Sequence, residues 1–310
     1  MSPRVPERTD SPSTAPTPRA RLRALLTDGG LITAPGVYDG LTAALVARTG
    51  FGAAYLTGAG VAVGGFGLPD IGLLTATEMT DRARIVATAL GGVPLIADAD
   101  TGYGAPTNVV RTVREYERAG VAAILLEDQA FPKRCGHLPD KELVPAVEFE
   151  AKLGAALDAR TDPDLVVIAR TDARGPLGLC EAIDRANRYA RAGADVIFVE
   201  APQSIEEIER IAAEVTDVPL LINMVQGGLT PDTAPDRLAK LGYRIAIHPG
   251  ALLGPTVLAG FDALARLGGT LPTDLTPGPE GLFELVGLRE WFAIAERHRG
   301  RDRDRDRPDA

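Results

Sequence analysis

The chain has 310 residues, of which 45% are hydrophobic and 24% charged, and its formal net charge is −9 at pH 7. This balance is typical of a globular protein and excludes a fibrous or wholly disordered chain. The negative charge and an aromatic content of only 5% disfavour a nucleic-acid partner. No apolar run approaches the roughly 20 residues that span a bilayer, and the first residues lack the apolar core of a secretory signal. We therefore expect a cytoplasmic protein with no membrane partner.

Composition divides the chain into four segments. Residues 1–20 are rich in proline, serine, threonine and charge, and they predict a disordered arm. Residues 300–310 alternate arginine with aspartate, which predicts a charged, disordered tail. Between these ends we expect a compact barrel over residues 21–280 and a helical segment over residues 281–299.

Eight short apolar runs recur along the compact region, and such runs are typical of parallel strands that are buried on both faces. They are Leu31–Ala34, Ala53–Leu56, Pro94–Ala97, Ala122–Leu126, Leu165–Ala169, Asp195–Val199, Val218–Ile222 and Arg244–Ile247. Amphipathic stretches of helical length, such as residues 107–119 and 204–215, lie between most of them. Eight strand–helix units in roughly 260 residues favour an α/β fold, the (β/α)8 TIM barrel, over an open doubly wound sheet.

Polar residues follow nearly every predicted strand, at the end where barrel enzymes place their active sites. Asp98 and Asp100 are two residues apart and therefore face the same way, and Glu127 ends the next strand. An all-oxygen, negatively charged cluster of this kind suits Mg²⁺, with Mn²⁺ as a second possibility. The alternative is a buried ion-pair network with Arg170.

The segment after the fourth predicted strand, residues 130–146, is long enough to act as a lid over the barrel mouth. It places Cys135 beside Lys133, Arg134 and His137. Because positive neighbours lower the pKa of a thiol, we expect thiolate chemistry to be available at Cys135. Cys180 lies in the helix that follows the fifth strand, and we expect it to be buried and inert.

Several motifs together resemble the isocitrate lyase/phosphoenolpyruvate mutase superfamily, in particular its methylisocitrate lyase branch. The matching segments are Tyr55–Gly58, Gly67–Asp70, Asp98–Gly104, Glu127–Gln129, Lys133–His137, Ala169–Asp172 and Asn223–Met224. The resemblance extends over nearly the whole chain, from Leu31 to Glu296.

The resemblance implies a barrel whose last helix is swapped between subunits, usually in a homotetramer. It implies that Asp98 binds Mg²⁺ directly, while Asp100 and Glu127 hold its water ligands. Cys135 would be the general acid/base of the carbon–carbon lyase branch, and Tyr55 and Glu200 are the candidate bases for a substrate hydroxyl. The implied substrate-binding residues are Tyr55, Thr57, Gly58, Ala59, Asp70, Lys133, Gly136, His137, Arg170, Glu200 and Asn223.

We therefore expect a Mg²⁺-dependent lyase that cleaves a 2-hydroxy di- or tricarboxylate, of the 2-methylisocitrate or dimethylmalate type, to a pyruvate-like oxoacid. Thr57 replaces the family's usual serine, and Ala59 stands where methylisocitrate lyases often have glycine. The arginine that those enzymes carry shortly after the eighth strand is missing from residues 250–255, which favours a smaller diacid. The alternatives are an oxaloacetate decarboxylase, a carboxyphosphonoenolpyruvate-type phosphonomutase and a non-catalytic oxoacid-binding protein.

Overall fold

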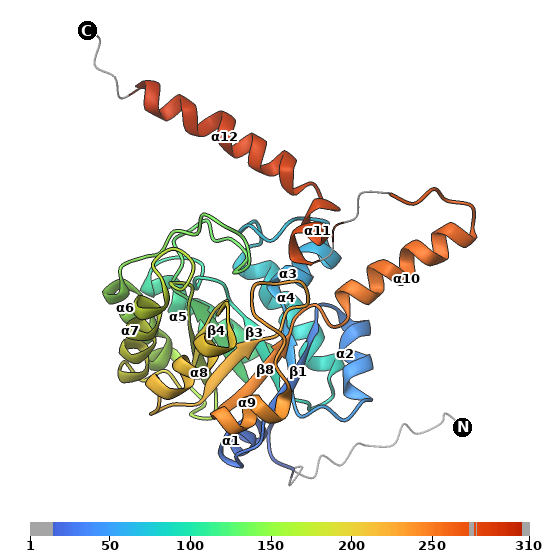
Figure 1. Cartoon of the computed structure of the whole chain (residues 1–310). Coiled ribbons are helices and arrows are strands. Elements are labelled where there is room, and N and C mark those ends of the chain that lie inside the picture. Colours follow the sequence, from blue (N-terminus) through green and yellow to red (C-terminus); the bar gives the residue numbers. More distant parts are fainter. Residues whose placement is uncertain (1–14, 273–275, 277, 306–310) are drawn as a thin grey trace, which may run out of the picture.

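Eight parallel strands form a closed barrel in the computed structural model, which describes residues 15–272, 276 and 278–305 (Figure 1). The strands are β1 (Ile32–Val37), β2 (Ala54–Leu56), β3 (Leu95–Asp98), β4 (Ala123–Glu127), β5 (Val166–Thr171), β6 (Val196–Val199), β7 (Leu220–Asn223) and β8 (Tyr243–His248). Each strand pairs with the next, and β8 pairs with β1. The prediction of a (β/α)8 barrel is confirmed, and the open sheet is excluded.

Helices cover the outside of this barrel, and most connect one strand to the next (Figure 1). They are α2 (Gly40–Ala47), α3 (Gly58–Val61), α4 (Ala76–Ala89), α5 (Pro106–Ala119), α6 (Ala146–Ala159), α7 (Leu179–Arg191), α8 (Ile205–Glu214) and α9 (Pro235–Leu241), with a short π-helical segment, η1 (Ala62–Phe66), after α3. Gly120 ends α5 with φ 91°, a left-handed conformation that favours glycine.

Alternation along the strands divides the apolar residues into two clusters. In β4, Ala123 and Leu125 point into the barrel, whereas Ile124 and Leu126 point outward and pack against the helices. The same period of two holds in the neighbouring strands, where Ile168 of β5 faces inward and Val167 faces outward. The barrel is therefore filled by its own side chains, and an opening remains at its carboxyl end.

The amino end of the barrel is closed by α1 (Pro18–Thr27). Leu22 and Leu26 of α1 pack into the inner cluster, and Arg23 donates a hydrogen bond of 2.7 Å to Asp195 at the start of β6. This helix begins within the segment 1–20 that was expected to be a disordered arm; residues 1–14 of that arm lie outside the described residues. The domain boundaries otherwise stay predictions.

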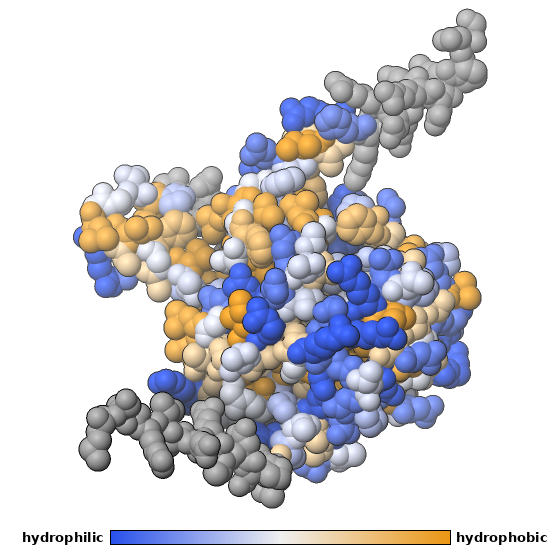
Figure 2. Space-filling model, turned by 180° about the vertical axis from the view of Figure 1, so that it is seen from behind, coloured by the Kyte–Doolittle hydropathy of each residue, from blue (hydrophilic) through white to orange (hydrophobic). Residues whose placement is uncertain are grey.

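The last three helices, α10 (Leu253–Arg266), α11 (Pro279–Glu284) and α12 (Leu288–Arg305), follow β8, and α10 and α12 project away from the barrel (Figure 1). Apolar side chains gather on the projecting α10, where Leu258 is 68% exposed (Figure 2). Because α12 extends to Arg305, residues 300–305 are helical rather than part of a disordered tail. No helix in the described part of the chain is both long and apolar enough to cross a membrane. The exchange of a helix between subunits stays a prediction.

Candidate active site

Inward- and outward-facing residues alternate along each strand, and at the carboxyl ends of the strands the inward-facing residues are polar. Leu125 faces inward, so Glu127, two residues further along β4, points toward the mouth as well. The same relation to an inward-facing residue holds for Thr57, Asp98, Arg170, Glu200 and Asn223. Buried positions at the carboxyl ends of six strands therefore carry polar groups, as the sequence predicted.

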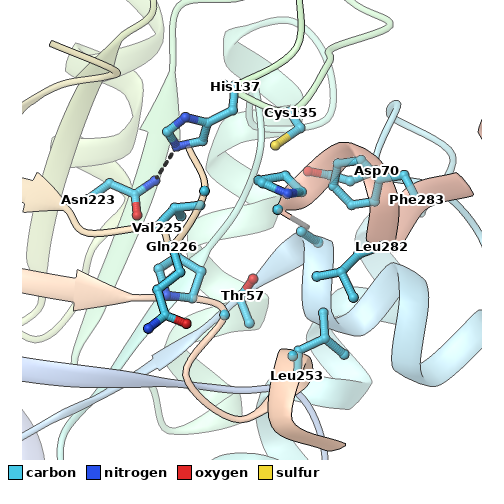
Figure 3. A pocket seen from close by; sticks show the side chains of 18 of the residues that line it. Thr57, Asp70, Cys135, His137, Asn223, Val225, Gln226, Leu253, Leu282 and Phe283 are labelled. Carbon is cyan, nitrogen blue, oxygen red and sulfur yellow. Dashed lines mark hydrogen bonds between the residues drawn. The ribbon is translucent and has the colours of Figure 1, made fainter. Parts of the chain in front are cut away.

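All of these groups except Glu127 line a cavity of about 460 Å³ at the barrel mouth (Figure 3). All the predicted substrate-binding residues except Gly58 line it, together with Asp98 and Cys135. Gly58 and Asp100 instead line a second, much smaller hollow. An apolar wall that includes Leu253, Leu282 and Phe283 also lines the main cavity (Figure 3). One wall can therefore hold charged substrate groups, while the other can hold hydrocarbon.

Asp98 and Asp100 converge at the end of β3. Asp98 Oδ2 accepts a 3.3 Å hydrogen bond from the Gly58 amide, and Asp98 Oδ1 accepts one of 3.1 Å from the Asp100 amide. Both carboxylates face the open side of Gly58, because a Cβ there would lie 2.8 Å from Asp98 and 3.7 Å from Asp100. Burial raises the pKa of Asp100 to about 6.

Glu127 is 1% exposed, and neither of its carboxylate oxygens has a hydrogen-bond partner. Buried oxygens without a hydrogen bond, together with Asp98 and Asp100, are the hard donors that Mg²⁺ prefers, so the residues fit a magnesium site. They do not form the compact three-carboxylate cluster that we expected. No group of three or more His, Cys, Asp or Glu side chains in the described part of the chain is placed to bind one metal ion directly. The water-mediated roles implied for Asp100 and Glu127 stay predictions.

Lys133 extends from the loop after β4 to these carboxylates. Its buried Nζ donates a hydrogen bond to Asp70 and lies 2.8 Å from Asp100 Oδ1. Its charge therefore compensates two carboxylates that approach from other parts of the chain. Lys133 thus links the loop to the acidic group as well as lining the cavity.

Arg170 is the centre of a second buried network. Its guanidinium group donates two hydrogen bonds to Asp172, of 2.8 and 2.9 Å. Its Nη1 lies 3.2 Å from Glu127 Oε2, and its Nη2 lies 3.4 Å from Glu200 Oε2. The ion-pair network that was the alternative to a metal site is therefore present, and it shares Glu127 with the group that fits a metal. A guanidinium held in this way presents a fixed orientation to a substrate carboxylate.

Cys135 does not have the lowered pKa that we expected. Burial and the nearby Asp70 carboxylate raise the pKa of this thiol to about 12. Lys133 lowers this pKa only in part, because it is paired with two carboxylates, and Arg134 lies over the ring of Phe292. Cys135 is thus a protonated thiol that points into the cavity (Figure 3), suited to donating a proton.

Glu200, His137 and Asn223 meet on the polar wall. The Asn223 amide donates a 3.2 Å hydrogen bond to Glu200 Oε2 and lies 3.4 Å from His137 Nε2 (Figure 3). The Leu229 amide donates to His137 Nδ1, and burial lowers the pKa of His137, so the ring is neutral. Burial and Asp98 raise the pKa of Tyr55 well above its usual value, which favours Glu200 as the base.

Sequence reasoning missed a group of fully buried charges behind this wall. Asp128 accepts hydrogen bonds from Arg185, Tyr189 and the Asp172 amide. Polar residues at the ends of β4 and β5 could have indicated this group. The hydrogen-bond partners of Asp128, however, are 44 to 61 residues away in the sequence. The expectation that Cys180 is buried is wrong, because it lies on the exposed side of α7.

Comparison with known proteins identifies the family. Residues 22–266 match the family model described as phosphoenolpyruvate phosphomutase. The chain is 49% identical to 2,3-dimethylmalate lyase of Eubacterium barkeri over 248 residues, which cover 80% of this chain and 85% of that one. It is 46% identical to 2-methylisocitrate lyase of Aeropyrum pernix over 228 residues, which cover 74% and 72% of the two chains.

A solved structure of oxaloacetate acetylhydrolase, in complex with 3,3-difluorooxalacetate, superimposes with a TM-score of 0.79 at 38% identity. The superposition covers 90% of this chain and 96% of that one. Family model, relatives and structure agree with the resemblance in the sequence. This chain therefore belongs to the phosphoenolpyruvate phosphomutase family, within the phosphoenolpyruvate mutase/isocitrate lyase superfamily.

Proposed function

We propose that this protein cleaves a carbon–carbon bond in an alkyl-substituted 2-hydroxy dicarboxylate of the 2,3-dimethylmalate type, and that it releases pyruvate and a short fatty acid. The relatives named as lyases bear out the class, a carbon–carbon lyase. The observation that carries the finer proposal is one cavity that combines a protonated thiol, a fixed guanidinium group and an apolar wall.

The charges around the cavity favour a dicarboxylate over a tricarboxylate. Among the described residues that line it, Lys133 and Arg170 are the only lysine or arginine side chains, and His137 is neutral. Leu253, which is 6% exposed, lines the wall after β8, in the region where the sequence lacks the family's arginine. Methyl groups can pack against Leu253 and its neighbours, whereas a third carboxylate there would be desolvated without a partner.

Proton transfers in the cleavage fit Glu200 and Cys135. Glu200 accepts the proton of the substrate's 2-hydroxyl group, and the C2–C3 bond breaks to form the C2 carbonyl group of pyruvate. The bonding electrons pass to C3, which takes the proton of the Cys135 thiol, so that 2,3-dimethylmalate gives pyruvate and propanoate. Return of the proton from Glu200 through solvent restores the thiol. Arg170 orients the carboxylate next to C2, and the loop that carries Cys135 excludes water.

A divalent cation, Mg²⁺ or Mn²⁺, would be held by Asp98, with Asp100 and Glu127 as further oxygen donors. When bound, it would supply Lewis-acid stabilisation of negative charge on the substrate oxygens. Asp98 also holds the Gly58 amide, so the same carboxylate positions the loop after β2.

The test is a screen of diacids with the EDTA-treated protein, with and without added Mg²⁺. Lactate dehydrogenase coupling measures pyruvate, and NMR identifies the second product. We expect Mg²⁺-dependent pyruvate and propanoate from 2,3-dimethylmalate, with a higher kcat/KM than for 2-methylisocitrate. A higher kcat/KM for 2-methylisocitrate would overturn the substrate class.

The same screen covers the alternative activities. Conversion of oxaloacetate to pyruvate and carbon dioxide would favour a decarboxylase, and conversion to oxalate and acetate would favour a hydrolase like the structural neighbour. Phosphorus NMR of phosphonate substrates tests the phosphonomutase. Absence of turnover on every compound would favour an oxoacid-binding protein.

Self-association, which the resemblance implies as a homotetramer, is part of the same proposal. It is supported by the exposed apolar side chains of α10, where Leu258 and Leu264 are 68% and 55% exposed.

A further inference from the structure

Lys141 occupies an unusual place in the loop between β4 and α6. It lies outside the cavity lining, yet its side chain is only 4% exposed. Its Nζ donates a hydrogen bond to the carbonyl oxygen of Gly136 and another, of 3.0 Å, to Asp172 Oδ1. One buried cation therefore joins the loop to the end of β5.

The first acceptor belongs to the part of the loop that carries the chemistry. Gly136 stands between Cys135 and His137, and its Cα is packed tightly against the polar wall. A Cβ on Gly136 would lie 2.5 Å from Arg170 Nη2 and 2.5 Å from Glu200 Cγ. The donor from Lys141 therefore acts on the peptide that brings the thiol to the cavity.

The second acceptor fixes the guanidinium group. Asp172 Oδ1 accepts from Lys141 and also from Arg170 Nη2 at 2.9 Å. The Asp172 amide donates to Asp128 at 2.9 Å, so the backbone on which this carboxylate stands is itself fixed. When the loop is in place, Lys141 shares Asp172 with the arginine that faces the substrate. When the loop moves away, Asp172 loses that cation.

We propose that Lys141 is a positioning residue that couples closure of the Cys135–His137 segment to the orientation of Arg170. It does not touch the substrate; it acts through the Gly136 carbonyl and the Asp172 carboxylate. This inference rests on the proposed function only for its effect on turnover. The coupling itself is a property of the chain without substrate.

The test compares the variants Lys141→Met and Lys141→Arg, with Lys240→Met as the matched control. Methionine keeps the length and apolar stem of lysine but removes the donors, whereas arginine keeps both charge and donors. Lys240 is exposed in the last turn of α9, far along the chain from the loop. The same change there should alter neither readout.

The first readout needs no substrate. The chain has two cysteines, and Cys180 is exposed on α7, so it provides an internal reference for alkylation of Cys135. A pulse of iodoacetamide, followed by mass spectrometry of the two peptides, gives the ratio of the labelling rates. In Lys141→Met we expect the Cys135 to Cys180 ratio to rise by about tenfold or more, the effect of losing a hydrogen bond to a charged group. In Lys141→Arg it should stay within about threefold.

The second readout is steady-state kinetics on the substrate found in the screen. Lys141→Met should lower kcat by a larger factor than it raises KM, because the thiol and the guanidinium group lose their relative placement. Lys141→Arg should restore most of kcat. If Lys141 served only stability, Lys141→Met would not lower kcat by a larger factor than it raises KM, and Lys141→Arg would not selectively restore kcat.

An unchanged labelling ratio in folded Lys141→Met would overturn the coupling, whatever happens to turnover. Circular dichroism checks the fold. If the methionine variant does not fold, Lys141→Gln, which can reach only one of the two acceptors, takes its place in the same labelling assay, and an unchanged ratio there has the same meaning. If no diacid is turned over but the ratio rises, Lys141 does hold the Cys135–His137 segment in place, and the proposed reaction fails.

Discussion

Gly136→Ala tests whether the loop must approach the polar wall as closely as the structure places it. A Cβ at this position would meet Arg170 Nη2 and Glu200 Cγ, both at 2.5 Å, whereas ordinary van der Waals contact begins at 3.4 Å. Neither neighbour can yield easily, because Arg170 is held by Asp172, and Glu200 accepts a 2.7 Å hydrogen bond from the Ala201 amide. The loop therefore has to retreat by about 0.9 Å.

A displacement of roughly 1 Å between reacting groups costs about 100-fold in rate. We therefore expect Gly136→Ala to lower kcat/KM by about two orders of magnitude, or about 2.7 kcal/mol in the free energy of activation. The substitution should hardly change the folded barrel, because Gly136 lies in a loop at its open end. Its thermal unfolding midpoint should stay close to that of the unmodified protein.

The assay is the coupled measurement of pyruvate on the substrate that the diacid screen identifies. Gly154→Ala is the control, because Gly154 lies within α6 and a Cβ there meets nothing within 4 Å. The control should keep its kcat/KM and gain about 0.5–1 kcal/mol of stability from the better helix former. If Gly136→Ala kept its kcat/KM within about twofold, the close approach would not be needed for catalysis, and the reasoning would be refuted.

Three further predictions concern other buried groups. Cys135→Ser should abolish turnover yet leave binding of the diacid intact in calorimetry; near-normal turnover would exclude Cys135 as the proton donor. Asp128→Asn should lower the free energy of unfolding by about 3 kcal/mol in urea titrations, because Arg185 loses its buried ion pair. Asp81→Asn, at an exposed site on α4, should change it by less than about 0.5 kcal/mol, and equal effects would contradict the argument. Finally, the Cys135 thiol has a pKa of about 12 in the folded chain against an ordinary 9.0, so the unfolded chain loses this proton first. Stability should therefore be fully present below pH 9 and fall between pH 9 and 12, by up to about 1.4 kcal/mol per pH unit relative to Cys135→Ser, and parallel curves for the two proteins would argue against the raised pKa.

The barrel could be predicted because its signals are local. Each strand is a continuous apolar run, such as Val166–Ala169, and a strand covered on both faces needs no polar alternation. Spacing by two then places Glu127 and Arg170 on the inner face without further information. The projecting α10 and α12 could not be placed in this way, because nothing in a local pattern says what an exposed apolar face packs against.

The environment of the thiol could not be predicted, because its neighbours in space are not those in sequence. Lys133 and Arg134 flank Cys135 in the chain but direct their charges to Asp70 and Asp100 and to Phe292. The backbone carbonyl of Asp70, in contrast, accepts a 3.1 Å hydrogen bond from the Cys135 amide, which brings an acidic residue to the thiol. Burial in the folded loop, together with this acidic residue 65 positions away, therefore raised the pKa of the thiol.

The role of Lys141 was hidden for a similar reason. Its two acceptors are 5 and 31 residues away, and only the folded loop brings them within reach of one ammonium group. Cys180 was expected to be buried because it lies in the helix after the fifth strand, but it stands in the first turn of α7 and is exposed.

Closure of the barrel floor by α1 has a consequence for how this enzyme tolerates change. Leu22 and Leu26 close the end of the barrel that lies opposite the cavity. This contribution to stability therefore comes from a region of the chain that is separate from the active site. Substitutions on α1 should change the free energy of unfolding and leave kcat unchanged. The sequence of α1 can therefore change, and can be altered to raise stability, without changing the active site at the other end of the barrel.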